Sequence, residues 1–315
     1  MSVDRQCTDT VFTVRPCRFQ ANPLTVKSNA FQADRPWDDL GASNTLAQQQ
    51  FDGLVATLDR AGVRCLVFDD TPEPHTPDSV FPNNWITTHA DGTVILYPME
   101  ATNRRGERRQ DIIDRLREEH GFVSERIIDL SAHEQEGRYL EGTGSLVLDR
   151  VNRVAFACRS TRTDAEVFGL ATDTLGYTPV LFNSVDGSGQ PIYHTNVMMW
   201  VGSTLAGVCL ESMSIEDQGL LLTRFAASEH QVLELSFAQL EAFAGNMLEL
   251  RSASGEPVMA LSQAAWDSLD SAQRRMLEAH AALAICPIDH IEQQSGGSVR
   301  CMLAEVHLPR VDRAG

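Results

Sequence analysis

Residues 83–99 read NNWITTHADGTVILYPM. Two short runs rich in β-branched residues flank the dipeptide Asp91-Gly92, which is a common sequence at the turn of a β-hairpin. The stretch therefore predicts a strand, a tight turn and a second strand. The same plan recurs at residues 145–160 (SLVLDRVNRVAFACRS), 196–213 (NVMMWVGSTLAGVCLESM) and 246–262 (NMLELRSASGEPVMALS).

A predicted helix follows each of these hairpins, and a short apolar strand follows each helix. Two of the helices begin with the pattern of a capping box, Thr163 with Glu166 and Ser214 with Asp217. An earlier helix, at about residues 44–61, likewise leads into the apolar run RCLVFDD. The other helices are expected at about residues 105–119, 163–175, 214–228 and 263–284, and the strands after them are ERIIDLS, TPVLFNSV, QVLELS and LAICPID.

The repeating unit is thus strand, strand, helix, strand. Its landmark positions, spaced by 57, 55, 50 and 55 residues, are Asn84, Glu141, Asn196, Asn246 and Cys301. The last unit, CMLAEVHLPR, has only its first strand, and the N-terminal run TVFTVRPC can supply the missing one. We therefore expect a single α/β domain over residues 1–315, a pseudo-fivefold α/β propeller of five modules closed by the N-terminal strand. The alternative is an ordinary mixed α/β sheet.

The overall charge of the chain argues against two classes of partner. Asp and Glu number 43 against 26 Lys and Arg, which gives a formal net charge of −17. Such a surface repels nucleic acid and anionic lipid, so neither is an expected partner. The first residues, MSVDRQCTDTVF, contain no apolar leader, and no run approaches the roughly 18 apolar residues of a membrane span.

The cysteines and histidines show no pattern of a metal or disulfide site. The seven cysteines include no C-x-x-C pair, and the nine histidines include no H-E-x-x-H motif. Reduced thiols in the cytoplasm, with no metal and no cofactor, are therefore expected. The sequence leaves open whether the chain forms a homo-oligomer.

Four of the landmark regions carry chemically useful side chains. Cys301 follows the pair Gly296-Gly297, where glycine lets a backbone or a ligand approach closely. His194 lies in YHTNVMMW, Glu141 in YLEGTGSLVLD, and Asn83-Asn84 in PDSVFPNNW. Each alone has a structural explanation: Cys301 could pack in the core, His194 could end a strand, and Glu141 could lie in a turn. However, all of them lie at the equivalent end of their modules. The Gly-Thr-Gly after Glu141 is expected to lead into a strand, so it does not fit a phosphate-binding loop.

Several short motifs resemble one family in the order in which they occur. PDSVFPNNW, LEGTGSLVLD, STRTD, YHTN and GGSVRC are similar to the guanidine-modifying superfamily of arginine deiminases, dimethylarginine dimethylaminohydrolases and amidinotransferases. The resemblance runs from about Val14 to Pro309. It is greatest to the citrulline-utilisation hydrolase branch, which VRPCRFQANPLTVKSNAFQ and FPNNW also resemble. The superfamily's fold is the five-module α/β propeller, which the repeat predicts independently.

The resemblance also implies roles for individual residues. Cys301 would be the nucleophile and His194 the general acid and base, because attack on a resonance-stabilised carbon needs a thiolate and a group that titrates near neutrality. Glu141 would bind a substrate nitrogen and hold the charged intermediate. Arg162 in STRTD would clamp the substrate carboxylate with its forked guanidinium, and the alternative for it is a surface salt bridge.

The chain departs from the family pattern at the residues that surround the reacting group. Arginine deiminases grip a cationic guanidinium with two aspartates, and the matching positions here are Asn84 and Asn196. Dimethylaminohydrolases have a Glu-Asp pair where this chain has Asn83-Asn84. A buried cation needs negative charge nearby, whereas an amide can both donate to and accept from a neutral ureido group. The pattern therefore favours a small amino-acid substrate, citrulline, hydrolysed to ornithine, ammonia and CO2.

Other functions stay open from the sequence. An arginine deiminase or dihydrolase would use Glu141 to hold the guanidinium, and a dimethylarginine-type hydrolase is a further alternative. An amidinotransferase is disfavoured because that branch retains acidic residues at the substituted positions. A non-catalytic amino-acid-binding propeller would be expected to lack the three catalytic side chains, and a cysteine amidase or protease would show a different motif order.

Overall fold

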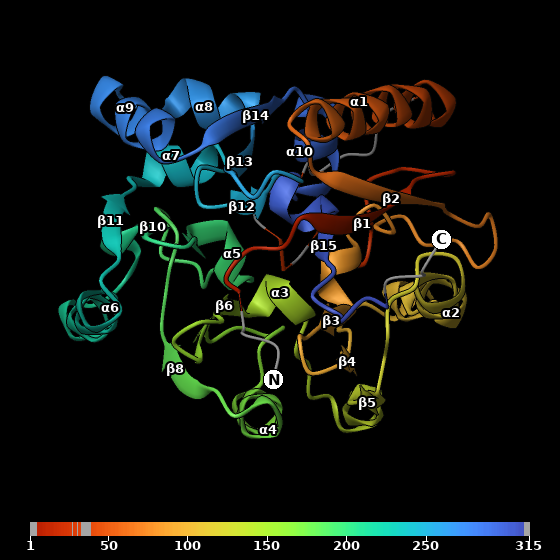
Figure 1. Cartoon of the computed structure of the whole chain (residues 1–315), viewed down its shortest axis with the longest axis horizontal. Helices are drawn as coiled ribbons and strands as arrows, with labels where there is room; N and C mark the ends of the chain where they lie inside the picture. Colours follow the sequence, from red (N-terminus) through yellow and green to blue (C-terminus); the bar gives the residue numbers. More distant parts are fainter. Residues whose placement is uncertain (1–4, 27, 30, 33–38, 312–315) are drawn as a thin grey trace.

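The computed structural model describes residues 5–26, 28–29, 31–32 and 39–311. Over these residues the strands form five three-stranded sheets in a mixed α/β fold. Figure 1 shows the longer helices α1, α2, α4, α6 and α9 at the periphery, with the one-turn helices α3 and α5 near the centre. The predicted repeat of strand, strand, helix and strand is confirmed.

Each of four sheets has an antiparallel hairpin whose second strand pairs in parallel with a later strand. A hairpin turn suits the antiparallel pair, and a helical crossover suits the parallel one. The sheets are β3 (Ile86–Thr88), β4 (Thr93–Leu96) and β5 (Arg126–Asp129); β6 (Val147–Asp149), β7 (Val154–Cys158) and β8 (Thr178–Phe182); β9 (Met199–Val201), β10 (Leu205–Val208) and β11 (Gln231–Glu234); and β12 (Leu248–Arg251), β13 (Pro257–Ser262) and β14 (Ala282–Cys286).

The fifth sheet joins the two ends of the chain. Strand β15 (Ala304–Glu305) pairs antiparallel with β1 (Thr10–Arg15), and β1 pairs in parallel with β2 (Arg64–Asp69). The N-terminal strand therefore supplies a strand that the last unit lacks, as the sequence predicts, and it lies in the middle of that sheet. Because β15 follows the segment that carries Cys301, this pairing anchors that segment to the rest of the protein.

The connecting helices agree with the predicted ones in place but differ at their ends. They are α1 (Leu40–Arg60), α2 (Gln110–Glu118), α4 (Ala165–Leu175), α6 (Ile215–Ala227), α8 (Gln263–Ser268) and α9 (Ser271–His280). The predicted cap at Thr163 is wrong, because the Asp164 carboxylate accepts hydrogen bonds from the first turn of α4. The single helix expected over 263–284 is two helices, because Asp270 ends one and caps the next with Gln273 in a capping box. At Ser214 the cap forms, but Asp217 bonds to the Asn183 backbone instead of completing a box.

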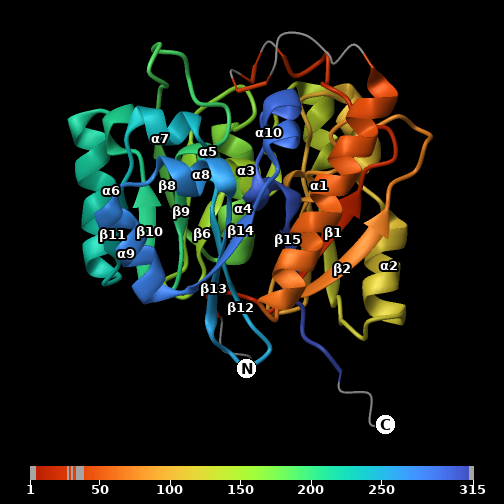
Figure 2. The ribbon, with the colours of Figure 1, turned by 90° about the horizontal axis from the view of Figure 1, so that it is seen from above.

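Further short helices connect these elements. They are α7 (Phe237–Glu241), α10 (Asp289–Ser295), and the 3₁₀ turns η2 (Thr102–Glu107), η3 (Ser131–Glu136) and η4 (Leu210–Ser212). Figure 2 shows α5 and α10 at one end of the strands and the β12–β13 hairpin at the other end. Within the described part of the chain, no helix is long and apolar enough to cross a membrane.

The sequence did not predict four one-turn helices that lie immediately before the first strand of a sheet. They are η1 (Pro82–Asn84), α3 (Gly142–Ser145), α5 (Thr195–Met198) and η5 (Val299–Met302). All their residues are buried. The Gly-Thr-Gly after Glu141 therefore opens a helix, contrary to the expected strand, although at four residues it is too short to bind a phosphate as a long helix does.

Apolar side chains from neighbouring sheets and outer helices form the core. One cluster joins Phe156 of β7, Met199 of β9 and Met259 of β13 with Phe225 of α6. Fully burying such a side chain contributes on the order of 1.5–3 kcal/mol. The core therefore fixes the sheets against one another and holds the buried one-turn helices in position.

Candidate active site

Cys301 lies on η5, and the glycine pair before it is required by close packing. The Cys301 backbone N–H donates to the Ser298 carbonyl at 3.0 Å and so forms the turn. A β-carbon on Gly296, which has a φ of 67°, would lie 2.7 Å from the Asn29 amide. A β-carbon on Gly297 would lie 2.7 Å from the Phe81 ring. Glycine therefore lets two other segments close over the cysteine.

The sulfur of Cys301 faces two amide groups. Nδ2 of Asn246 lies 3.2 Å from Sγ, and Nδ2 of Asn196 lies 3.4 Å from it. The Cys301 side chain is only 4% exposed. Amide N–H groups pointing at sulfur stabilise negative charge there, which is the form that acts as a nucleophile.

His194 and Glu141 form a buried pair beside the cysteine segment. Nε2 of His194 lies 2.8 Å from Oε2 of Glu141, and Oε1 of Glu141 accepts from the Glu100 backbone N–H at 2.9 Å. Burial alone would raise the pKa of Glu141. The charge of Arg162 and the hydrogen bond from His194 outweigh it and hold that pKa well below the usual range. Glu141 is therefore a carboxylate at neutral pH.

His194 is neutral at physiological pH. Burial is the main influence and lowers its pKa to about 4, although Glu141 acts in the opposite direction. This differs from the expected titration near neutrality, because the ring is only 3% exposed. A carboxylate can only accept, so Nε2 carries the ring proton and Nδ1 has a free lone pair. In the free protein, His194 is thus a base.

Arg162 is buried, so the surface salt bridge considered from the sequence is excluded. Its Nη1 lies 3.5 Å from Oε2 of Glu141, and its Nε lies 3.3 Å from Oε2 of Glu100. Its Nη2 donates to Oγ of Ser28 at 2.8 Å, and the guanidinium lies 4.9 Å from the centre of the Tyr193 ring. These contacts hold the guanidinium in a defined plane at the site.

A buried arginine sets the orientation of the Asn84 side chain. Nη1 of Arg104 donates to Oδ1 of Asn84 at 2.9 Å, while Nε and Nη2 donate to the Glu107 carboxylate at 2.9 Å each. A guanidinium has no acceptor, so the amide must present its oxygen to Arg104. Its Nδ2 has no hydrogen-bond partner among the described residues.

The free Nδ2 of Asn84 lies on the same side as His194. A β-carbon placed on Gly144 would be 2.4 Å from Asn84 Nδ2 and 2.8 Å from His194 Nδ1. Both atoms therefore border the space above Gly144, which only a glycine leaves open. One donor and one base thus lie next to each other.

These side chains share one small hollow. Its walls are formed by Thr25, Asn29, Asp78, Phe81, Asn84, Arg104, Arg162, Tyr193, His194, residues 295–297 and Cys301. Its volume is about 20 Å³, which is enough for one water molecule. An amino acid therefore enters only when some of the covering residues move.

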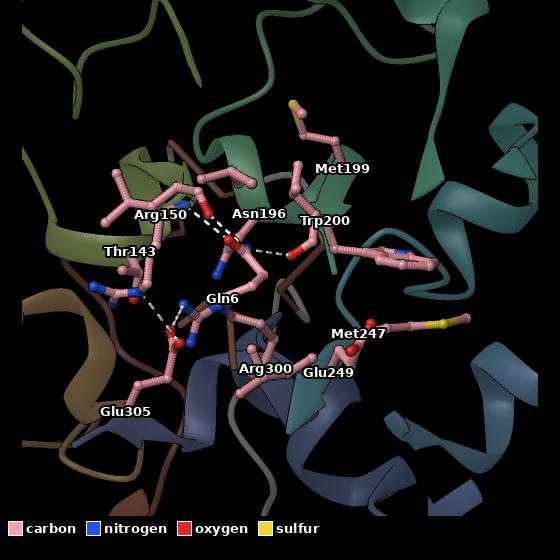
Figure 3. Close-up of a pocket in the computed structure, with 14 residues that line it drawn as sticks. Gln6, Thr143, Arg150, Asn196, Met199, Trp200, Met247, Glu249, Arg300 and Glu305 are labelled. Atoms are coloured by element: carbon pink, nitrogen blue, oxygen red, sulfur yellow. Dashed lines mark hydrogen bonds and ion pairs between the residues drawn. The ribbon is translucent and has the colours of Figure 1, made fainter. Parts of the chain in front are cut away.

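Asn83 and Asn196 are not on the wall of this hollow. Asn83 lies on η1, buried, with neither amide atom hydrogen-bonded to a described residue. Asn196 contacts the sulfur of Cys301 but does not line the hollow that contains His194 and Asn84. Figure 3 shows it on a second, inner hollow of about 30 Å³, together with Gln6, Thr143 and Arg150.

The structure adds residues that the sequence did not single out. Asp78, in the quoted motif PDSVFPNNW, is buried on the wall, with Oδ2 accepting from Asn22 Nδ2 at 2.7 Å. Its Oδ1 has no hydrogen-bond partner in the described part of the chain, and burial raises its pKa. Tyr193, the first residue of the quoted motif YHTN, and Arg104, which lies in no quoted motif, also form part of the wall. No three His, Cys, Asp or Glu side chains among the described residues are placed to hold a metal ion.

The fold and the residues around the hollow define a member of the guanidino-modifying superfamily. The family model described as "N,N dimethylarginine dimethylhydrolase, eukaryotic" matches residues 15–308, and the chain belongs to this family. The description of this family names a hydrolase. A search of curated proteins finds no match.

Solved structures share the fold at low sequence identity. ArgZ, an arginine dihydrolase from the ornithine-ammonia cycle in cyanobacteria, is similar with a TM-score of 0.74 and 15% identity. That match covers 96% of this chain but 41% of ArgZ, so the chain spans well under half of that protein. The N-terminal domain of ArgZ, as a cysteine-to-serine variant bound to substrate, has a TM-score of 0.73 and 15% identity. That match covers 96% of this chain and 99% of that domain. DDAH from Pseudomonas aeruginosa, in complex with citrulline, is similar with a TM-score of 0.63 and 14% identity. That match covers 96% of this chain and 100% of DDAH.

Proposed function

We propose that the chain hydrolyses a ureido amino acid, citrulline, to ornithine, ammonia and CO2, with Cys301 as nucleophile. The orientation of the Asn84 amide carries this proposal. Arg104 binds its oxygen, so Asn84 presents an N–H donor to the hollow.

A ureido group and a guanidinium differ in what they offer to that donor. The ureido oxygen accepts a hydrogen bond, whereas every terminal atom of a guanidinium donates. A guanidinium would set its N–H against the Asn84 N–H and bring a second cation towards Arg104. The mismatch would leave a buried donor unpaired, at a cost of roughly 1–3 kcal/mol. The ureido NH2 group can donate to Glu141.

The first half of the reaction forms a covalent intermediate. The Cys301 thiol gives its proton to Nδ1 of His194, and the sulfur electron pair forms a bond to the ureido carbon. The negative charge gathers on the ureido oxygen beside Asn84 Nδ2. His194 returns the proton to the leaving nitrogen as its C–N bond breaks, so that ammonia departs and a thiocarbamate remains.

The second half consumes water. His194 Nδ1 takes a proton from water, and the hydroxide oxygen bonds to the same carbon as the C–S bond breaks. The sulfur keeps the electron pair of that bond. The product is ornithine with a carboxylated side-chain nitrogen, which loses CO2. Citrulline and one water thus give ornithine, one ammonia and one CO2.

The two ends of the amino-acid head group match two charged side chains of the hollow. Arg162 would bind the carboxylate through its fork. Asp78 has a free, buried carboxylate oxygen and would accept from the ammonium group. Both side chains already have ion-pair partners, Arg162 in Glu141 and Glu100 and Asp78 in Arg104, so the head group would extend an existing charge network.

An arginine dihydrolase is the second candidate. The observation that favours it is the similarity to the N-terminal domain of ArgZ over nearly the whole chain. Such an enzyme takes arginine through the ureido stage, and Glu141 with Asp78 would supply its negative charge. A dimethylarginine-type hydrolase is the function that the family's description names.

Product analysis separates these functions. Purified protein is incubated with citrulline, arginine or dimethylarginine, and ammonia, ornithine, citrulline and dimethylamine are measured. Citrulline hydrolysis gives one ammonia per ornithine, whereas arginine dihydrolysis gives two. Accumulation of citrulline from arginine without ornithine would show a deiminase, and release of dimethylamine would show a dimethylarginine hydrolase. Either result would refute the citrulline proposal.

We further infer that the five sheets are the blades of one closed, pseudo-fivefold propeller that spans residues 1–315. Hydrogen bonds between successive modules support this arrangement, as from Asn246 to the Asn196 carbonyl and from Thr88 to the Glu305 carbonyl.

All seven cysteines are free thiols, which supports a reducing compartment such as the cytoplasm. Scattering in solution would test both the shape and the oligomeric state.

A further inference from the structure

We propose that Asn246 is a catalytic residue that holds the sulfur of Cys301 and stabilises its thiolate. The inference rests on Cys301 being the nucleophile of the proposed function. Asn246 lies in the loop before β12, in a different module from Cys301, and is 1% exposed.

Hydrogen bonds fix the amide of Asn246 in one orientation. Its Nδ2 donates to the Asn196 carbonyl at 2.8 Å, and its Oδ1 accepts from the Cys301 backbone N–H at 3.4 Å. A carbonyl only accepts and a backbone N–H only donates, so the reverse orientation would lose both bonds. The Nδ2 group must therefore face Sγ of Cys301, 3.2 Å away.

The other donor to the sulfur is not fixed in this way. Asn196 Nδ2 lies 3.4 Å from Sγ, but Asn196 Oδ1 has no hydrogen-bond partner among the described residues. Its amide can turn at little cost, whereas that of Asn246 cannot. Asn246 is thus the permanent donor to the nucleophile, and Asn196 is an adjustable one.

The loop that carries Asn246 is built for close approach. A β-carbon on Gly245 would lie 2.1 Å from the Val197 carbonyl oxygen, so only glycine allows the contact between these modules. Phe243 has a φ of 61°, which is uncommon for a bulky residue, and its carbonyl accepts from the Asn246 N–H at 2.8 Å. The uncommon backbone conformation at Phe243 and the close approach at Gly245 together place the Asn246 amide against the sulfur of Cys301.

The test measures the rate at which iodoacetamide alkylates Cys301 at a series of pH values. Mass spectrometry quantifies the alkylated Cys301 peptide, and the pH at which the rate is half its maximum is the midpoint. We compare wild type, Asn246→Ala and the nearly isosteric Asn246→Asp. A hydrogen bond to a charged group is strong enough to shift the pH midpoint of alkylation upward by about one unit or more in Asn246→Ala. Asn246→Asp should shift it further, because a carboxylate would face the thiolate.

Gln6→Leu is the matched control. Gln6 is also buried, and it bridges two modules through the Leu148 and Val201 carbonyls at 2.8 and 2.9 Å, without touching Cys301. Its midpoint should equal that of wild type. Circular dichroism confirms that each variant is folded.

An unchanged midpoint in both Asn246 variants would overturn the proposal. If neither variant folds, wild-type protein labelled with ¹⁵N-asparagine replaces them. Asparagine side-chain signals should then move with pH around the alkylation midpoint, and stay still in Cys301→Ser. Alkylation needs no substrate, so absent turnover of citrulline would reject the proposed function and leave this test intact.

Discussion

Arg104 donates from Nη1 to Oδ1 of Asn84 at 2.9 Å, and this contact decides which end of the Asn84 amide faces the hollow beside Cys301 and His194. Glu107 binds the other edge of the guanidinium, so Arg104 cannot turn away. The hydrogen-bonding character of the site therefore depends on Arg104 as well as on Asn84. Substrate preference should respond to changes in either residue.

Asn84→Asp should shift preference from citrulline towards arginine. The carboxylate would keep its bond to Arg104 and turn its second oxygen into the hollow, where it repels the ureido oxygen and attracts a guanidinium. A charged hydrogen bond contributes about 1.5–3 kcal/mol, so the ratio of kcat/KM values should move roughly tenfold or more. Steady-state kinetics with both substrates measures this ratio.

Asn196→Asp is the companion variant. It would remove a donor to the Cys301 sulfur and place a charge beside it, so turnover of every substrate should fall without a change in preference. If the wild-type protein prefers arginine and releases citrulline as its final product, the proposal that Asn84 selects a neutral ureido group is wrong.

Cys301→Ser should abolish turnover and leave the fold and ligand binding intact, because a serine hydroxyl is too weak a nucleophile for this carbon. In wild type, iodoacetamide should label Cys301 ahead of the other cysteines. Burial raises the pKa of the half-buried Cys17 and Cys65 to about 11 and about 12, so these compete poorly near neutral pH. Peptide mapping identifies the labelled residue, and preferential labelling elsewhere would remove Cys301 from its role.

Gly144→Ala should inactivate the enzyme without unfolding it. The new methyl group would lie within 2.8 Å of both Asn84 Nδ2 and His194 Nδ1 and displace them. Gly169→Ala is the matched control, because Gly169 lies within helix α4 and its β-carbon would meet nothing within 4 Å. The control should keep full activity and gain up to about 1 kcal/mol of stability. Equal activities in the two variants would show that the space above Gly144 is not used.

The sequence predicts the sheets well because each strand carries a local signal. The Asp91-Gly92 turn and the alternation around it depend only on neighbours in the chain, and the observed β3–β4 hairpin follows them. The sequence does not predict the break at Leu269–Asp270, because a run of helix-forming residues continues on both sides. There, a capping carboxylate overrides the propensity of its neighbours.

The site is less predictable because it forms between modules. Short motifs predict Cys301, His194 and Glu141 as site residues, and the structure brings them to one region. The link between Arg104 and Asn84 spans 20 residues and leaves no periodic signal. Similarly, Asn246 is a landmark of the repeat, but its contact with Cys301 crosses 55 residues and depends on the three-dimensional fold.

His194→Ala should lower kcat about 10²- to 10⁴-fold, the usual contribution of a general acid and base. The pH dependence of kcat/KM is more specific. Burial lowers the pKa of His194 to about 4, so the base form should persist down to about pH 4 and activity should fall only below that. A loss of activity centred near pH 6.5 would show that the free enzyme holds His194 in a more solvated environment. A rate within a few-fold of wild type in His194→Ala would remove it from the mechanism.

The ion pair between His280 and Glu249 should make the stability of the fold depend on pH. Nε2 of His280 lies 2.6 Å from Oε2 of Glu249, which also accepts from Ser203. The hydrogen bond to Glu249 raises the pKa of His280 above its ordinary value of 6.5. Burial alone would raise the pKa of Glu249, but the bonds from His280 and Ser203 lower it below 4.5.

The two shifts define a window for this contribution. A raised histidine pKa stabilises the fold fully below pH 6.5, and the effect disappears as pH rises through the folded value. A lowered glutamate pKa stabilises it above pH 4.5, and that effect disappears as pH falls through the folded value. His280→Gln keeps a neutral donor and removes the charge, so it should lose about 1 kcal/mol or less between pH 4.5 and 6.5 and almost nothing at pH 9. Urea unfolding of both proteins at pH 5.5 and 9 measures the difference, and an equal loss at the two pH values would mean that the charge of His280 does not stabilise the fold.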